Sequence, residues 1–347
     1  MSIPHSVTSI GYEALAGNQL TSIYIPDSVT SIDGYAFSDN QLTSITIPHS
    51  VTHIGESAFS NNQLTSIAIP HSVTYIGRSA FSNNQLVRVT IPDSVTAIGG
   101  APFMRNPTLI EITVSSGNQE FRSVDGVLFN IDGTSLLQWP KGKPCLVIIP
   151  ESVTSIGRWA FAHNRLTGIV IPDNVTSIGA YAFTGNQLTS VSIPNSVAYI
   201  GESAFRDNQL TGITIPDSVT YIGRSAFADN RLDSIAIPSS ITYIQDFLFR
   251  NNQLTSITIS DSVTHIGSSA FAHNRLTNVI IPDSVTTIER WAFAVNELTS
   301  IIMPTNMTNI GGNNALGNHH ASFIVFYMEQ NRQAGIYTFT EGRWSRQ

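Results

Sequence analysis

Residues 42–63 read LTSITIPHSVTHIGESAFSNNQ, and residues 64–85 read LTSIAIPHSVTYIGRSAFSNNQ. The second stretch repeats the first at every position but three, so the period is 22 residues. The proline of this unit recurs in register at Pro4, Pro26, Pro48, Pro70, Pro92, Pro150, Pro172, Pro194, Pro216, Pro238, Pro282 and Pro304, with Ser260 in its place once. So short and strict a period is typical of a solenoid, in which each unit packs only on its neighbours.

Within one unit the apolar residues follow the L-x-x-L-x-L strand pattern of leucine-rich repeats. Ile45 and Ile47 alternate with a period of two and are expected to face the core. Pro48 ends that strand because proline donates no ladder hydrogen bond. Ile54 belongs to a second buried segment, and residues 55–60 are expected to form a short helical or 3₁₀ turn. The sequence therefore predicts a right-handed, mainly β leucine-rich-repeat solenoid of about thirteen turns, with a parallel strand at each L-x-x-I-x-I segment.

Stacked identical units align equivalent residues into columns, and two columns are well marked. The first is Phe37, Phe59, Phe81, Phe103, Phe161, Phe183, Phe205, Phe227, Phe249, Phe271 and Phe293. The second is Asn18, Asn40, Asn62, Asn84, Asn106, Asn164, Asn186, Asn208, Asn230, Asn252, Asn274, Asn296 and Asn318. We expect the phenylalanines to form a continuous aromatic spine. The asparagines should bond the turn backbone of their own and the next unit, because a buried amide needs partners.

One interruption lies between Pro92 and Pro150, which are 58 residues apart. Two Asp-Gly steps there separate apolar runs, which is a strong hairpin signal. We predict strands near Phe121–Val124, Val127–Asn130 and Ser135–Trp139. The interruption is therefore interpreted as a β-hairpin elaboration within the solenoid, and a bend that divides the array into two arms is the alternative.

The C-terminal segment is also non-repetitive. Phe323–Tyr327 and Ile336–Phe339 are strand-like, and a strand pair covered by Trp344 would close the open end of the core. The predicted layout is one solenoid over residues 1–347, with repeats at 1–114, the elaboration at 115–146, repeats at 147–320 and a β cap at 321–347.

The composition restricts the classes of partner. Charged residues make up only 12% of the chain, and the net charge of −7 argues against a nucleic-acid groove, which needs a basic stripe. No apolar run approaches the ~20 residues of a membrane-spanning helix, so no membrane insertion is expected. Met1-Ser2-Ile3-Pro4 already match the repeat, so no signal peptide is expected in this sequence; either the protein is not exported by that route or a leader has been removed.

Catalytic and metal-binding patterns are weak. His49 and His71 share a column and would lie about 5 Å apart on adjacent turns, but a third ligand is missing. Cys145 has no neighbouring base to activate it. We therefore expect no enzyme activity, no catalytic residue, no metal and no cofactor.

The variable positions of the repeat are better candidates for recognition. Tyr75, Tyr199, Tyr221 and Tyr243 share one column. The last three lie on consecutive turns and are predicted to stack into an exposed strip, since tyrosine is favoured at recognition surfaces. Simple packing between turns is the alternative interpretation.

Two other variable surfaces stand out. The strand side carries small hydroxyl residues such as Thr211 and Thr214. After the glycine, Glu56 precedes Arg78 and Glu202 precedes Arg224 by one turn, so both pairs are predicted to join opposite charges on adjacent turns.

The units Ile-Pro-Asp-Ser-Val-Thr-Ser-Ile-Gly, Ala-Phe and Leu-Thr-Ser-Ile resemble BspA-type (Treponema pallidum-type) leucine-rich repeats of bacterial surface proteins. The insertion at Ser123–Phe129 with Trp139-Pro140 is similar to one frequent in that family. The asparagine column departs from the family's usual cysteine, and most units are one residue shorter than its usual 23.

The resemblance implies an extracellular or cell-surface, adhesin-like protein that binds host or bacterial proteins or glycans through an extended repeat face. No ligand-contacting residue can be transferred, because the family has no fixed binding motif. A structural spacer and an ice-binding protein with a threonine-rich face are the alternatives.

Overall fold

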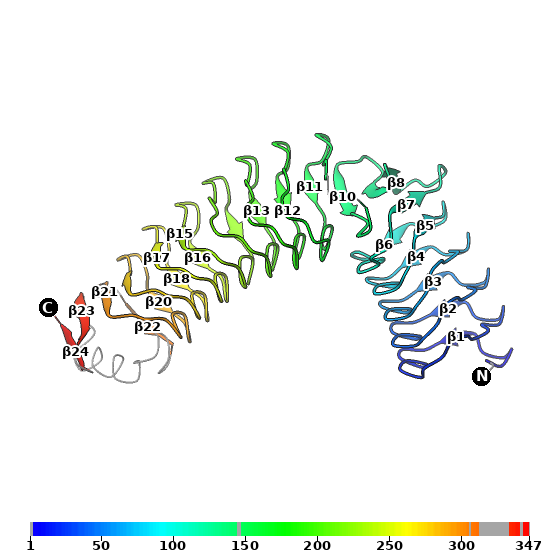
Figure 1. The fold of residues 1–347 in the computed structure, drawn as a ribbon, viewed down its shortest axis with the longest axis horizontal. Coiled ribbons are helices and arrows are strands. Elements are labelled where there is room, and N and C mark those ends of the chain that lie inside the picture. The colour runs from blue at the N-terminus through cyan, green and yellow to red at the C-terminus, as the bar shows by residue number, and fades with distance from the viewer. Residues whose placement is uncertain (1–2, 144–146, 305–306, 312–332, 341–342, 347) are drawn as a thin grey trace. The chain divides into compact units, whose positions relative to one another are not determined.

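The computed structural model describes residues 3–143, 147–304, 307–311, 333–340 and 343–346. The chain forms two compact units, Met1–Asn164 and Arg165–Gln347. In each unit the backbone winds in successive turns, and equivalent residues of neighbouring turns lie beside each other (Figure 1). The predicted β-solenoid of 22-residue turns is confirmed.

Each regular turn contributes a two-residue strand from its V-T-x-I segment. In the first unit these strands are β1 (Ser9–Ile10), β2 (Ser31–Ile32), β3 (His53–Ile54), β4 (Tyr75–Ile76), β6 (Ala97–Ile98) and β11 (Ser155–Ile156). In the second they are β12 (Ser177–Ile178), β13 (Tyr199–Ile200), β14 (Tyr221–Ile222), β16 (Tyr243–Ile244), β18 (His265–Ile266), β20 (Thr287–Ile288) and β22 (Asn309–Ile310). Neighbours pair in parallel with identical positions in register, but β14 and β16 belong to different sheets. The column of strands in the second unit is therefore interrupted between those two turns.

The prediction of a strand at every L-x-x-I-x-I segment is wrong for most units. Strands occur there only in β5 (Arg88–Ile91), β7 (Glu111–Val114), β15 (Ser234–Ala236), β17 (Ser256–Thr258), β19 (Asn278–Ile280) and β21 (Ser300–Met303), among the described residues.

The predicted helical turn is also wrong, since the described residues contain no helix. Ser57 and Asn61 have φ angles of 51° and 55°, and equivalent residues of other turns share this left-handed conformation. A left-handed residue every fourth position stops an α- or 3₁₀-helix. The segment instead alternates local turns, such as Ser60 N–H to Ser57 O at 3.0 Å, with bonds to the next turn, such as Phe59 N–H to Ala80 O at 2.8 Å.

Close approach of successive turns requires a glycine at position 55. A Cβ on Gly55 would lie 2.5 Å from the carbonyl carbon of Asp33 and from the nitrogen of Gly34, both in the preceding turn. Gly55 is therefore needed because two backbones touch, and its φ is not in the left-handed region.

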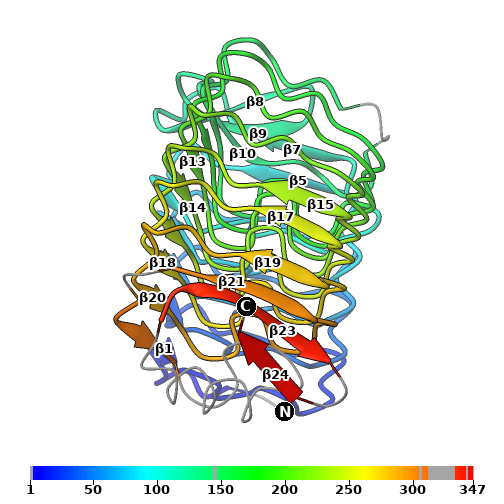
Figure 2. The same ribbon diagram turned by 90° about the vertical axis from the view of Figure 1, so that its left-hand side faces the viewer.

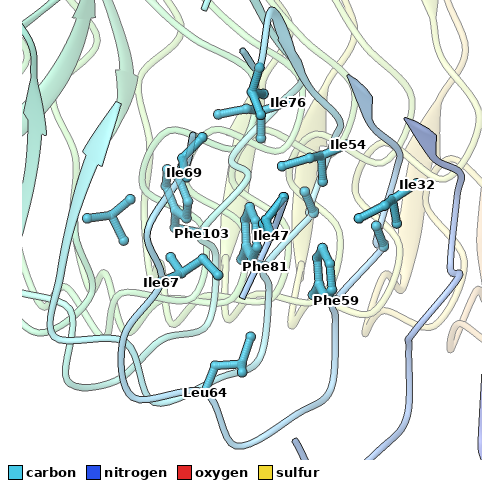
Figure 3. Close-up of a cluster of buried hydrophobic side chains, with 14 of the residues drawn as sticks. Ile32, Ile47, Ile54, Phe59, Leu64, Ile67, Ile69, Ile76, Phe81 and Phe103 are labelled. Atoms are coloured by element: carbon cyan, nitrogen blue, oxygen red, sulfur yellow. The ribbon is translucent and has the colours of Figure 1, made fainter. Parts of the chain in front are cut away.

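The phenylalanine column forms the predicted spine of the core (Figure 3). Phe59 is fully buried and stacks on Phe37 at 5.2 Å and on Phe81 at 5.3 Å between ring centroids. Trp139, predicted from the sequence to end a strand of the insertion, takes the position of a phenylalanine in one turn. Its ring stacks on Phe161 at 5.7 Å, and its backbone N–H donates to Ala160 O at 2.8 Å.

The asparagine ladder is confirmed for the buried members of the column, which bond the preceding turn where the next was expected; Asn18 is exposed, and its side chain bonds Ala16 O of its own turn. The Nδ2 of Asn62 donates to Phe59 O, to Ser60 O and, at 2.9 Å, to Phe37 O of the preceding turn. Its Oδ1 accepts from Leu42 N–H at 3.0 Å. Every polar group of the buried amide is thus used. The last member of the column, Asn318, lies outside the described residues.

The insertion has the three predicted strands, β8 (Phe121–Val124), β9 (Val127–Asn130) and β10 (Ser135–Gln138). They pair antiparallel in the order β8, β9, β10. β10 then pairs in parallel with β11, Leu136 opposite Ile156. The insertion therefore also supplies one turn of the solenoid in the first unit.

A strand pair lies at the C-terminal end, as predicted, but with other partners. β23 (Gly335–Thr340) pairs antiparallel with β21 and with β24 (Arg343–Arg346), as Figure 2 shows. Trp344 is buried within β24 and lies 5.2 Å from Phe339 between ring centroids. The other predicted strand, Phe323–Tyr327, lies outside the described residues.

Candidate recognition surfaces

Two of the predicted tyrosines form a stacked, exposed pair on β13 and β14. Tyr199 lies opposite Tyr221 in the parallel register, and their rings are 5.1 Å apart and 6° from parallel. The two residues are 44% and 41% exposed. Parallel pairing on adjacent turns places the rings face to face, so their edges and hydroxyl groups remain accessible to a partner.

The other two tyrosines do not extend this pair. Tyr243 lies beyond the interruption of the strand column, is half-buried, and stacks on His265 at 5.6 Å. Its hydroxyl donates to Glu289 Oε1 at 3.3 Å, and burial, with the nearby Glu289 charge, raises its pKa. Tyr75, in the first unit, stacks on His53 at 4.6 Å. The strip predicted to hold three stacked tyrosines thus holds two.

The hydroxyl-rich strand side contains broad, open depressions. One of about 620 Å³ is lined by Ser192, Asn195, Gly212, Thr214, Ser234 and neighbouring aliphatic residues, and a second of about 610 Å³ adjoins it around Thr214 and Asp217. Apart from Asp217, they present small neutral groups, which suit hydrogen bonding to a sugar or to an extended peptide backbone.

A third depression, on the G-x-x-A-F turns of the second unit, is charged and was not predicted from the sequence. Its volume is about 430 Å³. Its lining residues are Tyr181, Glu202, Ser203, Arg206, Arg224, Ser225, Ala228, Asp229, Phe247, Arg250 and Asn251. They come from four successive turns at equivalent positions, so the depression runs across the turns.

The two carboxylates of this depression already have donors. The Tyr181 hydroxyl donates to Glu202 Oε1 at 2.7 Å. Asp229 accepts from Arg206 Nε at 2.8 Å on one oxygen and from Asn251 Nδ2 at 2.6 Å on the other.

Two of the three arginines instead lie against an aromatic ring. The guanidinium carbon of Arg224 is 4.7 Å from the centroid of Phe247, and that of Arg250 is 5.6 Å from it. Both distances are within the range of a cation–π contact. The predicted ion pair between Glu202 and Arg224 is therefore absent from this part of the described chain, whereas the predicted pair between Glu56 and Arg78 is present.

A signal for this depression is visible in hindsight. Phe247 replaces the serine that occupies the equivalent position at Ser203 and Ser225, and Arg206 and Arg250 stand where other turns have Ser60 or Ala228. Large or charged residues that replace small ones at one repeat position on neighbouring turns indicate a specialised region of the repeat surface.

The arrangement of histidine and acidic side chains was the other candidate feature. In the described ranges, no group of three or more His, Cys, Asp or Glu side chains is placed to hold a metal ion. His71 bonds Asp93 through Nδ1 at 2.8 Å, and this hydrogen bond lowers the pKa of Asp93. Cys145 lies outside the described residues. No helix long and apolar enough to cross a membrane occurs in the described part of the chain.

Comparison with known families and structures agrees with this architecture. The family model of the BspA type leucine rich repeat region matches residues 1–121, 145–232 and 222–341, in six copies. No curated protein sequence matches the chain.

Several solved structures are similar. A leucine-rich repeat protein from Eubacterium ventriosum has 25% identity and a TM-score of 0.63, over 89% of this chain and 84% of that one. The pneumococcal vaccine antigen PcpA has 27% identity and a TM-score of 0.63, over 84% and 74% of the two chains. A leucine rich cell surface protein from Faecalibacterium prausnitzii has 26% identity and a TM-score of 0.51, over 89% and 78%.

Proposed function

This chain belongs to the BspA-type leucine-rich-repeat family, and we propose that it is a non-enzymatic, adhesin-like binding protein of the cell surface or extracellular space. Repeat proteins of this kind generally serve as interaction scaffolds, because stacked turns present an extended face whose variable positions the core does not dictate. The similarity to a leucine rich cell surface protein supports the location.

The observation that carries the proposal is the exposed Tyr199–Tyr221 pair. A soluble protein gains little stability from two stacked rings that are each more than 40% exposed. Such a pair offers a partner rigid aromatic area with little loss of side-chain entropy, which is how tyrosine contributes at protein interfaces. We therefore assign the contact with a partner protein to Tyr199 and Tyr221. Tyr243 and Tyr75 are secondary candidates because their rings are more covered.

The test compares the Tyr199→Ser/Tyr221→Ser variant with the wild-type protein for capture by immobilised extracellular-matrix proteins and by a glycan array. Loss of one hot-spot tyrosine costs about 2 kcal/mol, so we expect capture by the protein ligand to weaken about thirtyfold or more. Tyr24→Ser is the matched control, since Tyr24 is 57% exposed but lies in the first unit.

Circular dichroism must show both variants to be folded. Undiminished capture by the double variant would reject the tyrosine pair. Capture confined to glycans and lost on altering Thr214 would move the binding surface to the hydroxyl-rich depressions.

A further inference from the structure

The charged depression of about 430 Å³ on the second unit is lined by residues other than the tyrosine pair. We infer that it is a binding site for a carboxylate, and that Arg224 and Arg250 hold the side chain of a Glu or Asp residue of a partner protein. The choice of a protein as the source rests on the proposed function. The site itself rests on the following contacts.

Arg224 has unused hydrogen-bonding capacity. Its side chain is exposed and, within the described residues, has no hydrogen-bond acceptor; its contact is with the Phe247 ring. A guanidinium group carries five N–H donors in a planar fork that matches the two oxygens of a carboxylate. The contact with Phe247, 4.7 Å from the guanidinium carbon to the ring centroid, involves no oxygen acceptor, so the N–H donors of Arg224 remain available to a carboxylate while the ring holds the group in place.

Arg250 adds a second donor group. Its Nε is buried and has no hydrogen-bond partner in the described structure, although the residue lines the depression. An unsatisfied buried N–H is unfavourable, and it is more so on a charged group. A bound carboxylate would lower the cost of leaving this cation without a counter-ion.

The net charge of the side chains that line the depression favours a singly charged anion as the ligand. Three arginines and two carboxylates line the depression, which leaves one positive charge in excess. Asp229 is bonded on both oxygens, by Arg206 and Asn251, and Glu202 accepts a hydrogen bond from Tyr181 on one oxygen; neither carboxylate is bonded to Arg224 or Arg250 in the described structure. One excess charge matches a singly charged carboxylate, whereas a sulfate or phosphate dianion would face repulsion from Glu202 and Asp229.

The same contacts favour an acidic side chain over a sugar acid. A pyranose ring binds best on an open aromatic face, but the Phe247 ring already carries guanidinium groups at 4.7 and 5.6 Å. The Tyr181 hydroxyl is engaged with Glu202. In addition, Tyr221 precedes Arg224 by three residues. A protein that covers the tyrosine pair is therefore near enough to place an acidic residue in the depression.

The experiment titrates the full chain with acetyl-Gly-Glu-Gly-amide and follows the Nε–Hε signals of Arg224 and Arg250 by NMR. We expect saturable shifts of both signals with the Glu peptide and none with acetyl-Gly-Gln-Gly-amide. Arg224→Gln should weaken binding at least fivefold. Arg78→Gln is the matched control and should leave binding unchanged, because Arg78 holds the same position of its repeat but is paired with Glu56.

Equal binding of the Gln peptide, or unchanged binding by Arg224→Gln, would overturn the inference. Tighter binding of N-acetylneuraminic acid or of sulfate than of the Glu peptide would also overturn it, in favour of a sugar acid or a dianion. Should Arg250→Gln fail to fold, Phe247→Ala tests the same site and should weaken binding by freeing Arg224. The Tyr199→Ser/Tyr221→Ser variant should bind the peptide normally, which separates failure of this site from failure of the proposed function.

Discussion

Two stretches of the molecule present nearly the same side chains at equivalent positions on four turns and yet arrange them differently. The first has Tyr35, Glu56, Arg78 and Ala101, and the second has Tyr181, Glu202, Arg224 and Phe247. In both, the tyrosine hydroxyl donates to the glutamate, at 3.1 Å in the first and 2.7 Å in the second. The first arginine pairs with its glutamate, whereas the second lies on Phe247.

The different state of the two arginines accompanies one difference in the following turn, where Phe247 replaces Ala101. An exposed ion pair contributes between 0 and about 1 kcal/mol, and an exposed cation–π contact about 0.5–1 kcal/mol. Because the two interactions are so similar in strength, a ring within reach is sufficient to separate Arg224 from Glu202. Ala101 offers no ring, so Arg78 stays with Glu56.

The two stretches are comparable only if the cores beneath them are equally stable. Replacing one spine phenylalanine beneath each stretch tests this, and it has the largest expected effect on stability. Phe59 and Phe205 are both fully buried and stacked on two neighbours. Phe59→Ala and Phe205→Ala should each lower the free energy of unfolding by about 3–5 kcal/mol, as measured by urea denaturation. A difference of more than about 2 kcal/mol between them would show that the cores are not equivalent.

The asparagine ladder should give a smaller, again equal, effect. Asn208 donates to Phe183 O at 2.9 Å and accepts from Leu188 N–H at 3.1 Å, as Asn62 does with Phe37 and Leu42. Asn62→Ala and Asn208→Ala should each cost about 1–3 kcal/mol, because turn groups are left unpaired in the core. An unchanged melting midpoint in either variant would refute the ladder as a source of stability.

The smallest expected effect is the coupling energy between the glutamate and the arginine, and it should differ between the two stretches. A double-mutant cycle with Glu56→Gln and Arg78→Gln should give a coupling of about 0.2–1 kcal/mol, and the cycle with Glu202→Gln and Arg224→Gln a coupling near zero. In the Phe247→Ala background, the second coupling should rise to the level of the first. If the Glu202–Arg224 coupling equals the Glu56–Arg78 coupling while Phe247 is present, the two arginines do not differ in their pairing.

The pH dependence of the first cycle has a defined sign. The hydrogen bond from Arg78 lowers the pKa of Glu56 below its usual value of 4.5. The coupling should therefore be complete above pH 4.5 and be lost as the pH falls through the lowered pKa of the folded state. A coupling that persists at a pH where Glu56 is protonated would not be an ion pair.

Several features were predictable from the sequence because, in a strict repeat, equivalent residues of all turns share the same environment. The buried Phe59, the amide of Asn62 and the facing rings of Tyr199 and Tyr221 all follow from a spacing of 22 residues. The strands of the insertion followed from its Asp-Gly turns. The prediction of a helical turn near Ser57 was wrong, because the left-handed φ of this serine cannot be recognised from the pattern of hydrophobic residues.

The sequence by itself determined that the chain is a solenoid and which residues fill its core, because burial of a repeated apolar pattern involves many kcal/mol and has one solution. Only the tertiary structure decided which partner each surface charge takes. Arg224 can contact either Glu202, one turn before it, or Phe247, one turn after it. The free energies of these two contacts differ by less than about 1 kcal/mol. So small a difference is resolved by the positions of the side chains, and those positions leave Arg224 beside Arg250 with its N–H donors free for a ligand.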